Sequence, residues 1–239
     1  YVEEVTPAAE EVQNNTLTEA EKEEGWILLF NGENSEGWRG YNKENFPAAW
    51  EVADGTLHIQ GSGRGEAGAE DGGDILYAED KFGDFHLKID WKISEGGNSG
   101  IIYFAEEGPE YAWMTAPEMQ VLDNENHPDA EKGKNGNRKA GSLYDVIPAD
   151  PQTAKPHGEL NHAEIIVRGD NVKHILNGKT VVEYTIGSEE LEALIADSKW
   201  PAINENWSDF AEEGYIVLQD HGDDAWYRNI KIKKLEVEE

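Results

Sequence analysis

Nine residues in the first half of the chain alternate strictly between apolar and polar side chains. Over Phe85–Ile93 the odd positions are Phe, Leu, Ile, Trp and Ile, and the even positions are His, Lys, Asp and Lys. Successive side chains of a β-strand point to opposite faces, so a period of two predicts a strand with one buried and one solvated face. The segment therefore requires a sheet with a core on one side.

Two turn sequences predict β-hairpins. Asn177-Gly178 lies between apolar runs, and so does Asp54-Gly55. Both dipeptides suit the left-handed φ values of a type I′ turn. The hairpin strands are expected at 172–176 with 180–184 and at 50–52 with 57–59, and further strands at 27–30, 75–77, 101–104, 119–122, 143–147, 164–167, 215–218 and 226–235. About a dozen short strands separated by turns indicate an all-β sandwich or barrel.

Helices are expected in two places only. Residues 1–24 form a Glu-rich tail in which Thr16 to Glu19 is a candidate capping box for a short helix. Ser188 is expected to cap a surface helix near 188–198, because the apolar residues that follow it fall on one helical face. The length of 239 residues suits one all-β domain, so we expect a tail at 1–24 and a single domain at 25–239.

The chain is strongly acidic, with 50 Asp and Glu residues against 20 Lys and Arg and a net charge of −30. Nucleic acids and anionic lipid surfaces are therefore not expected partners, because both require Lys or Arg. The longest purely apolar run, 26–30, is far shorter than the about 20 residues that span a bilayer. The chain has no cysteine, which excludes disulfides and thiolate chemistry.

Four motifs place polar side chains beside predicted strands. The residues concerned are Asn98 in GGNSG, Glu118 and Gln120 on one face of EMQVLD, Tyr144 in GSLYD, and Asp220 and His221 in LQDHGD. Each motif also has a purely structural interpretation. GGNSG would be a tight connection between strands, and EMQVLD a strand with one solvated face. Tyr144 would be a buried core tyrosine, and His221 an exposed turn histidine. A loop histidine between carboxylates can accept a proton, donate one or bind a metal.

Several familiar chemistries have no motif in this chain. It contains no G-x-S-x-G elbow, no H-E-x-x-H helix, no P-loop and no dinucleotide-binding fingerprint. The loop from Asp123 to Asp129 is rich in oxygen ligands, although it lacks the register of an EF-hand. A divalent cation such as calcium therefore stays open, and no other cofactor is indicated.

Six segments taken in order resemble one known family. They are 17–41, GNSGI at 97–101, EMQVLD at 118–123, GSLYD at 141–145, 161–178 and 216–235, and together they resemble the 3-keto-disaccharide hydrolase family. The resemblance implies a concanavalin A-like jelly roll of two antiparallel sheets, one of them concave and facing sugar. It also implies an oxidised glycoside as the carbohydrate substrate and a periplasmic or cell-surface location. A start at Tyr1 is compatible with a trimmed export signal. The oligomeric state is left open.

The resemblance also implies site residues by motif position. Glu118, Gln120, Asp123, Tyr144, Asp220 and His221 would line the concave site, with Asn98 and Arg228 as supports. The acidic, Trp-bearing stretch at 200–213 departs from the commoner pattern of the family. We expect this stretch to lie at the rim of the site and to alter the substrate it admits.

A 3-keto sugar permits a route that differs from ordinary glycoside hydrolysis. The ketone acidifies the hydrogen on C2, so a base can form an enolate that expels the C1 substituent, and water then adds to the enone. The expected roles are base for His221, oriented by Asp220 or Asp223, acid or second base for Glu118, and enolate stabilisation for Tyr144, Arg228 or a bound cation.

Two alternatives come from other classes of protein. One is a lectin-like carbohydrate-binding module, in which the same groove binds sugar without turnover. The other is a conventional glycosidase with Glu118 and Asp123 as its carboxyl pair.

Overall fold

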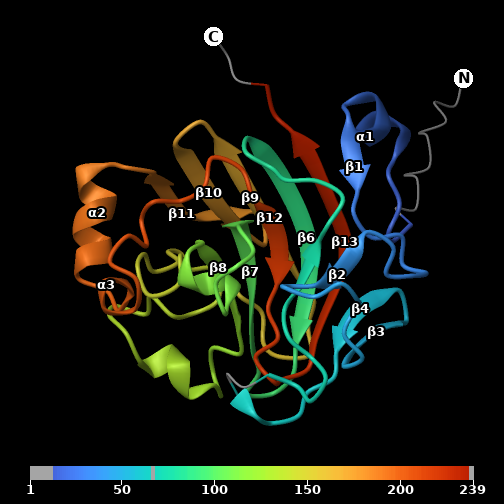
Figure 1. Cartoon of the computed structure of the whole chain (residues 1–239), viewed down its shortest axis with the longest axis horizontal. Helices are drawn as coiled ribbons and strands as arrows, with labels where there is room; N and C mark the ends of the chain where they lie inside the picture. The colour runs from blue at the N-terminus through green and yellow to red at the C-terminus, as the bar shows by residue number, and fades with distance from the viewer. Residues whose placement is uncertain (1–12, 66–67, 237–239) are drawn as a thin grey trace, which may run out of the picture.

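Two antiparallel sheets packed face to face form the framework of the fold, as expected for a concanavalin A-like jelly-roll sandwich (Figure 1). This computed structural model describes residues 13–65 and 68–236. The larger sheet has the strand order β11 (Lys179–Thr185), β10 (Asn171–Leu176), β9 (Asn161–Arg168), β6 (Phe85–Ile93), β13 (Ala225–Lys234), β4 (Thr56–Ile59) and β3 (Trp50–Ala53), with β1 (Trp26–Leu28) also paired to β13. The smaller sheet has the order β2 (Trp38–Gly40), β5 (Ile75–Tyr77), β12 (Tyr215–Leu218), β7 (Asn98–Ala105) and β8 (Glu118–Leu122).

Strand β6 confirms the alternation predicted from the sequence. Its odd positions are buried and its even positions are partly exposed, and it pairs with β9 on one side and β13 on the other. The buried side chains, among them Phe85 and Trp91, share one apolar core with Met119 and Val121 of the other sheet. The main core therefore lies between the two sheets.

Both predicted hairpins are present. Asn177 and Gly178 have φ values of 51° and 78°, and Asp54 and Gly55 have 50° and 70°. Two left-handed residues in succession are what a type I′ turn requires. The side chain of Asn177 also accepts a hydrogen bond from the backbone N–H of His162, which ties the turn between β10 and β11 to β9.

The five-stranded sheet is covered on its outer face as well as its inner face. Strands β7 and β8 are buried at every position. Ile102 of β7 and Val217 of β12 point away from the main core into a second apolar cluster, to which Ala112 of the short 3₁₀-helix η2 (Ala112–Met114) also belongs. Polar side chains on this outer face are therefore enclosed by loops rather than exposed to solvent.

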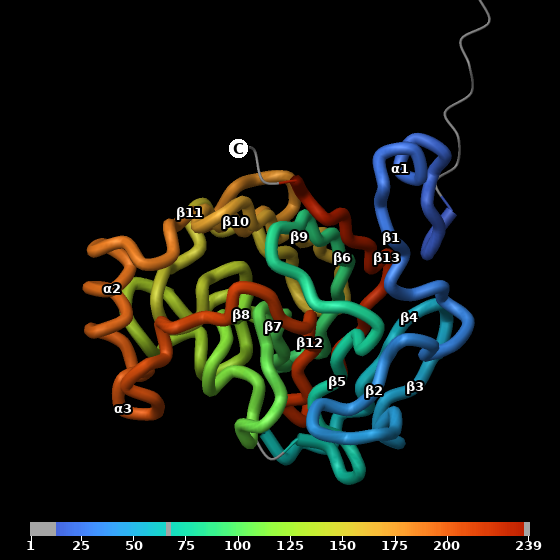
Figure 2. Tube along the Cα trace, turned by 45° about the horizontal axis from the view of Figure 1, so that its top comes forward, coloured from blue at the N-terminus to red at the C-terminus, as the bar shows by residue number. Residues whose placement is uncertain are grey.

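The three α-helices of the described residues lie at opposite ends of the molecule (Figures 1 and 2). Helix α1 (Glu19–Glu23) lies at one end, and α2 (Glu189–Ala196) and α3 (Trp200–Ile203) at the other. Helix α2 begins at the predicted cap, because the Ser188 hydroxyl accepts the backbone N–H of Leu191. Within the residues that the structure describes, no helix has the length and apolarity needed to cross a membrane.

The capping box of α1 lies two residues later than predicted. Thr18, rather than Thr16, accepts the N–H of Glu21, and the Glu21 carboxylate accepts the N–H of Thr18. The Thr16 hydroxyl instead donates to the carbonyl of Gln13. Both threonines precede a glutamate by three residues, so the pattern did not distinguish them. Residues 1–12 of the predicted tail lie outside the described residues, and the division at residue 24 stays a prediction.

The predicted strand at 143–147 is wrong. Leu143 forms isolated bridges to Met119 and Ile147, and Asp145 has a φ of 63°, so the chain turns here. The Asp145 carboxylate accepts hydrogen bonds from the Arg138 guanidinium and the Lys199 N–H, which favour the turn over a strand. The sequence analysis also missed β2 and α3, because three or four residues are too few to show a period.

Candidate active site

A pocket opens on the outer face of the five-stranded sheet. Asn98, Glu118 and Gln120 point into it, on the face opposite to Met119 and Val121. The space between its walls amounts to about 860 Å³ when the open solvent at the mouth is included. Besides these three residues the lining includes Tyr41, Lys43, Asp74, Tyr111, Trp113, Tyr144, Lys199, Trp200, Gln219, Asp220 and His221.

Six of the eight residues predicted for the site line this pocket. They are Asn98, Glu118, Gln120, Tyr144, Asp220 and His221. They come from β7, β8, the turn after β8 and the end of β12, which are far apart in the sequence and adjacent in the sheet.

Asp123 and Arg228 are not among the lining residues. Asp123 accepts hydrogen bonds from the Gly96 N–H, the Glu125 N–H and the Asn126 amide, so it organises the loops where β7 begins and β8 ends. Arg228 belongs to β13 of the larger sheet, and its Nε lies 3.9 Å from Asp90 of the same sheet. Its neighbour Tyr227 is in the main core, so Arg228 points outward, away from the pocket.

Glu118 lies at the bottom of the pocket and is only 3% exposed. Burial raises the pKa of its carboxyl to about 8; the ammonium of Lys199 acts in the opposite direction, and the charges of Asp74 and Asp129 add to the rise. The paired strand β7 has Gly100 at this level, and a Cβ there would collide with the Glu118 carboxyl. The glycine of the GNSGI motif therefore makes room for this side chain.

Asp74 is a second buried carboxyl in the pocket, and the sequence analysis did not identify it. One of its oxygens accepts the backbone N–H of Asp220. Burial raises its pKa to about 7, and the neighbouring charge of Asp220 contributes to the rise. Asp74 follows Gly72 and Gly73 before a three-residue strand, so by sequence it resembles an ordinary turn residue.

Asp220 shapes one wall of the pocket. Its carboxylate accepts backbone N–H groups from Ala69, Gly73 and Gly222 at 2.7–3.1 Å. A Cβ on Gly72 would collide with the same carboxylate. Asp220 therefore anchors the glycine-rich loop that precedes β5, and its oxygens are occupied by the protein itself.

Aromatic side chains form the opposite wall around a lysine. The Lys199 Nζ lies 4.4 Å from the ring centre of Tyr144 and 4.7 Å from that of Trp200, and burial lowers the pKa of the amine. The Trp200 ring stacks on Trp207 with centroids 4.4 Å apart, and the Trp207 indole N–H donates to the carbonyl of Trp113. The stretch at 200–213 thus contributes Trp200 directly and holds the wall from behind.

Two tyrosines of the pocket, Tyr144 and Tyr111, differ in their exposure to solvent. The Tyr144 hydroxyl donates to Asp129 at 2.6 Å, and its pKa is raised by burial and by that carboxylate. Tyr111 stacks on Trp113 with centroids 5.2 Å apart and remains 37% exposed. The stacked pair of Tyr111 and Trp113 therefore exposes the tyrosine ring at the rim.

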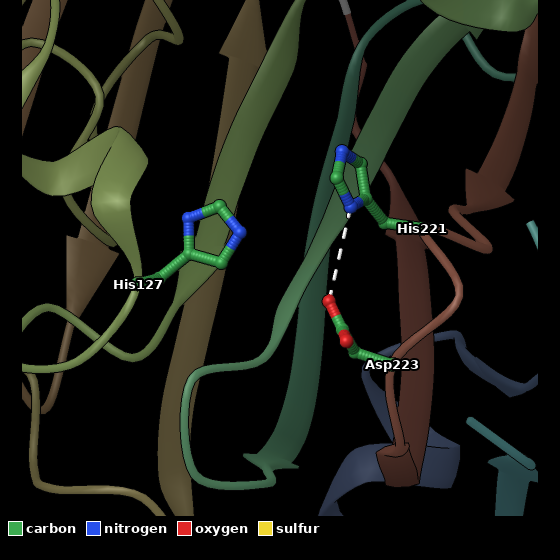
Figure 3. Close-up of side chains that lie close together, drawn as sticks. All are labelled: His127, His221 and Asp223. Atoms are coloured by element: carbon green, nitrogen blue, oxygen red, sulfur yellow. Dashed lines mark ion pairs between the residues drawn. The ribbon is translucent and has the colours of Figure 1, made fainter. Parts of the chain in front are cut away.

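His221 lies close to His127 and Asp223, two side chains that can bind the same metal ion as His221 (Figure 3). Its Nδ1 is 3.8 Å from a carboxylate oxygen of Asp223, and ligand atoms of His127, His221 and Asp223 all lie within 4.8 Å of one another. The rings of His127 and His221 are 6.0 Å apart. His127 was not singled out as a site residue, because it follows β8 in a polar loop without a metal-binding spacing.

The fold and the pocket together define a class of protein. Buried carboxyls, amides and aromatic faces on a β-sandwich are typical of proteins that bind or cleave carbohydrates. Residues 25–233 match the model of the 3-keto-alpha-glucoside-1,2-lyase-like domain family. The chain belongs to this family.

Individual relatives agree with that assignment. A protein of Bacteroides thetaiotaomicron named 3-keto-disaccharide hydrolase is 46% identical over 231 residues, which are 89% of this chain and 79% of the relative. A crystal structure of a candidate glycosyl hydrolase from Parabacteroides distasonis has 31% identity and a TM-score of 0.80, covering 94% of this chain and all of that one. A second structure from the same organism, similarly described, has 27% identity and a TM-score of 0.66, over 88% of this chain and 99% of the other.

Proposed function

We propose that this protein is a glycoside hydrolase that cleaves 3-keto glycosides by elimination and hydration. Family membership and the name of the relative from Bacteroides thetaiotaomicron support the substrate class. The observation that carries the mechanism is the presence of two buried carboxyls, Asp74 and Glu118, with raised pKa values in one pocket.

The reaction needs one base and one acid. The base takes the proton from C2, the enolate expels the C1 oxygen, and the acid protonates that oxygen as the C1–O bond breaks. Water then adds to C1 of the enone and C2 regains a proton, so that the net change is hydrolysis. An electrophile at the ketone oxygen lowers the energy of the enolate.

Asp74 and Glu118 fit the two proton-transfer roles. Burial raises the pKa of both carboxyls into the neutral range, to about 7 for Asp74 and about 8 for Glu118, so Asp74 is the more readily ionised of the two and Glu118 the more readily protonated. Two titratable groups whose environments separate their pKa values can serve as base and acid at the same pH. We therefore assign the base to Asp74 and the acid to Glu118, with the Lys199 ammonium as a positive charge for the enolate.

His221 is less well placed for the role of base that the sequence analysis predicts. The carboxylate of Asp220 is occupied by backbone N–H groups. The carboxylate of Asp223 is 3.8 Å from the imidazole, which is too long for the hydrogen bond that orients a catalytic histidine. The assignment of His221 as base stays a prediction, and so does the location outside the cytoplasm.

The test uses a 3-keto aryl glucoside, its unoxidised parent and a 3-keto substrate with deuterium at C2. We expect release of the aglycone from the keto compound only, with a primary isotope effect. Release from the parent would favour a conventional glycosidase, and binding without release a lectin-like module; either result would overturn the proposal. Asp74→Asn and Glu118→Gln should each reduce turnover by about 100-fold or more. The matched changes Asp71→Asn and Glu125→Gln, at exposed positions, should not.

A further inference from the structure

Two histidines and one aspartate meet at the edge of the pocket. His221 and Asp223 follow β12, and His127 follows β8 on the other side of β7. Figure 3 shows a ring nitrogen of His127 turned toward the gap between the other two side chains. The Nδ1 of His127 accepts the N–H of Asp129 at 3.1 Å, so the nitrogen that faces the gap is Nε2.

Two buried polar side-chain atoms in the pocket lining have no hydrogen-bond partner within the part of the chain that the structure describes. Five buried side-chain polar atoms of the described residues have no hydrogen-bond partner, and two of them are His221 Nδ1 and Asn98 Oδ1. Asn98 is 4% exposed and lines the pocket, and its backbone N–H donates to Asp223 at 3.0 Å. Buried polar atoms without a partner are rare and call for an explanation. An imidazole nitrogen without a hydrogen bond, 3.8 Å from a carboxylate oxygen, is a position at which one cation can bind both groups.

The spacing is close to that of a metal centre before it contracts around the ion. Metal–nitrogen and metal–oxygen bonds of about 2.0–2.2 Å put neighbouring ligand atoms roughly 3.0–3.6 Å apart. The observed 3.8 Å between His221 and Asp223 exceeds this by less than about 1 Å, and the limit of 4.8 Å for the whole cluster exceeds it by roughly 1 to 2 Å. Small side-chain rotations would close the difference. Coordination through His127 Nε2 moves the ring proton to Nδ1, so the hydrogen bond from Asp129 must break.

The geometry points to a divalent transition-metal site formed by His127, His221 and Asp223. Two imidazoles and one carboxylate suit zinc, manganese, cobalt or ferrous iron rather than calcium or magnesium, which prefer oxygen ligands. Three protein ligands leave coordination positions for substrate, and His221 itself lines the pocket. A metal ion at this position supplies an electrophile for the ketone oxygen, which deepens the proposed function. This role of the metal rests on the proposed function.

The experiment measures metal binding without substrate. The full chain is stripped with EDTA and titrated calorimetrically with ZnCl₂, MnCl₂ and MgCl₂, and the cobalt form is examined by visible absorption. We expect one Zn²⁺ or Mn²⁺ per chain, weak or no binding of Mg²⁺, and a visible cobalt band. His127→Gln and Asp223→Asn should each weaken binding by about 100-fold. His157→Gln, which removes an imidazole outside the cluster, should not.

Each outcome bears on a different claim. Circular dichroism on every variant separates a lost ligand from a lost fold. If the wild-type chain binds no Zn²⁺ or Mn²⁺ stoichiometrically, or if both folded variants bind as well as wild type, the metal site is refuted while the cleavage of 3-keto glycosides stands. If Glu118→Gln binds metal normally but the wild type fails to cleave the keto substrate, the proposed function falls and the metal site remains.

Discussion

Replacing Glu118 by Gln is expected to make the protein less sensitive to alkaline pH. A carboxyl whose pKa is about 8 in the folded chain, against an ordinary 4.5, keeps its proton in the folded state and releases it in the unfolded state between these values. Its contribution to stability is therefore complete below pH 4.5 and is lost as the pH rises through about 8. A neutral glutamine undergoes no such change.

The magnitude follows from this difference in pKa. Because one pKa unit corresponds to about 1.36 kcal/mol, the free energy of unfolding of the wild type should fall by roughly 3 to 4 kcal/mol relative to the variant between pH 5 and pH 8. Costs of the substitution that do not depend on pH, such as the desolvation of the amide, cancel in this comparison. Asp74 titrates in both proteins and cancels to first order.

Urea unfolding of both proteins at pH 5, 6, 7 and 8 measures the effect. Gln120→Asn is the control, because it alters the same strand without removing a titratable group, and its stability should follow the wild-type pH dependence. A constant difference between wild type and Glu118→Gln at all four pH values would refute the claim that the carboxyl is buried in its neutral form. A growing difference in the opposite direction would refute it equally.

Three further predictions concern turnover. Gly100→Ala should reduce kcat by about 10-fold or more while circular dichroism is unchanged, because the new methyl group displaces the Glu118 carboxyl. The profile of kcat/KM against pH should rise through about 7 as Asp74 ionises and fall through about 8 as Glu118 loses its proton, and Asp74→Asn should remove the rising limb. Tyr111→Ala should raise KM for a 3-keto disaccharide about 10-fold and leave a methyl 3-keto glycoside unaffected, since the exposed ring extends the surface of Trp113. Unchanged kinetics in any of the three would contradict the corresponding role.

The parts of the fold that the sequence predicted are those with a local cause. The alternation in β6 and the dipeptides Asn177-Gly178 and Asp54-Gly55 specify backbone geometry within a few residues. The turn at 143–147 depends instead on the Arg138 side chain and on the backbone N–H of Lys199, which is 54 residues from Asp145 in the chain. Its apolar residues resemble a strand until those partners are known.

The residues of the site also divide into those that the sequence predicted and those that it did not. Sequence motifs indicated which carboxylates lie near strand ends, but not which of them already accept hydrogen bonds from the protein. The carboxylates of Asp123 and Asp220 both accept several hydrogen bonds from nearby loops, whereas no hydrogen bond to the Glu118 carboxyl is found within the described residues. Asp74 and His127 enter the site only through the packing of β5 and the loop after β8 against β7 and β12. No pattern of neighbouring residues marks either position.

The hydrogen bonds behind the aromatic wall have a consequence for ligand recognition. The indole N–H of Trp200 donates to the carbonyl of Tyr144 and that of Trp207 to the carbonyl of Trp113, so these rings are held in place before any sugar arrives. A preorganised surface loses little conformational entropy when it is occupied. Affinity should then respond to the shape of the incoming ring more than to its flexibility, and the free and occupied forms should superimpose closely along this wall.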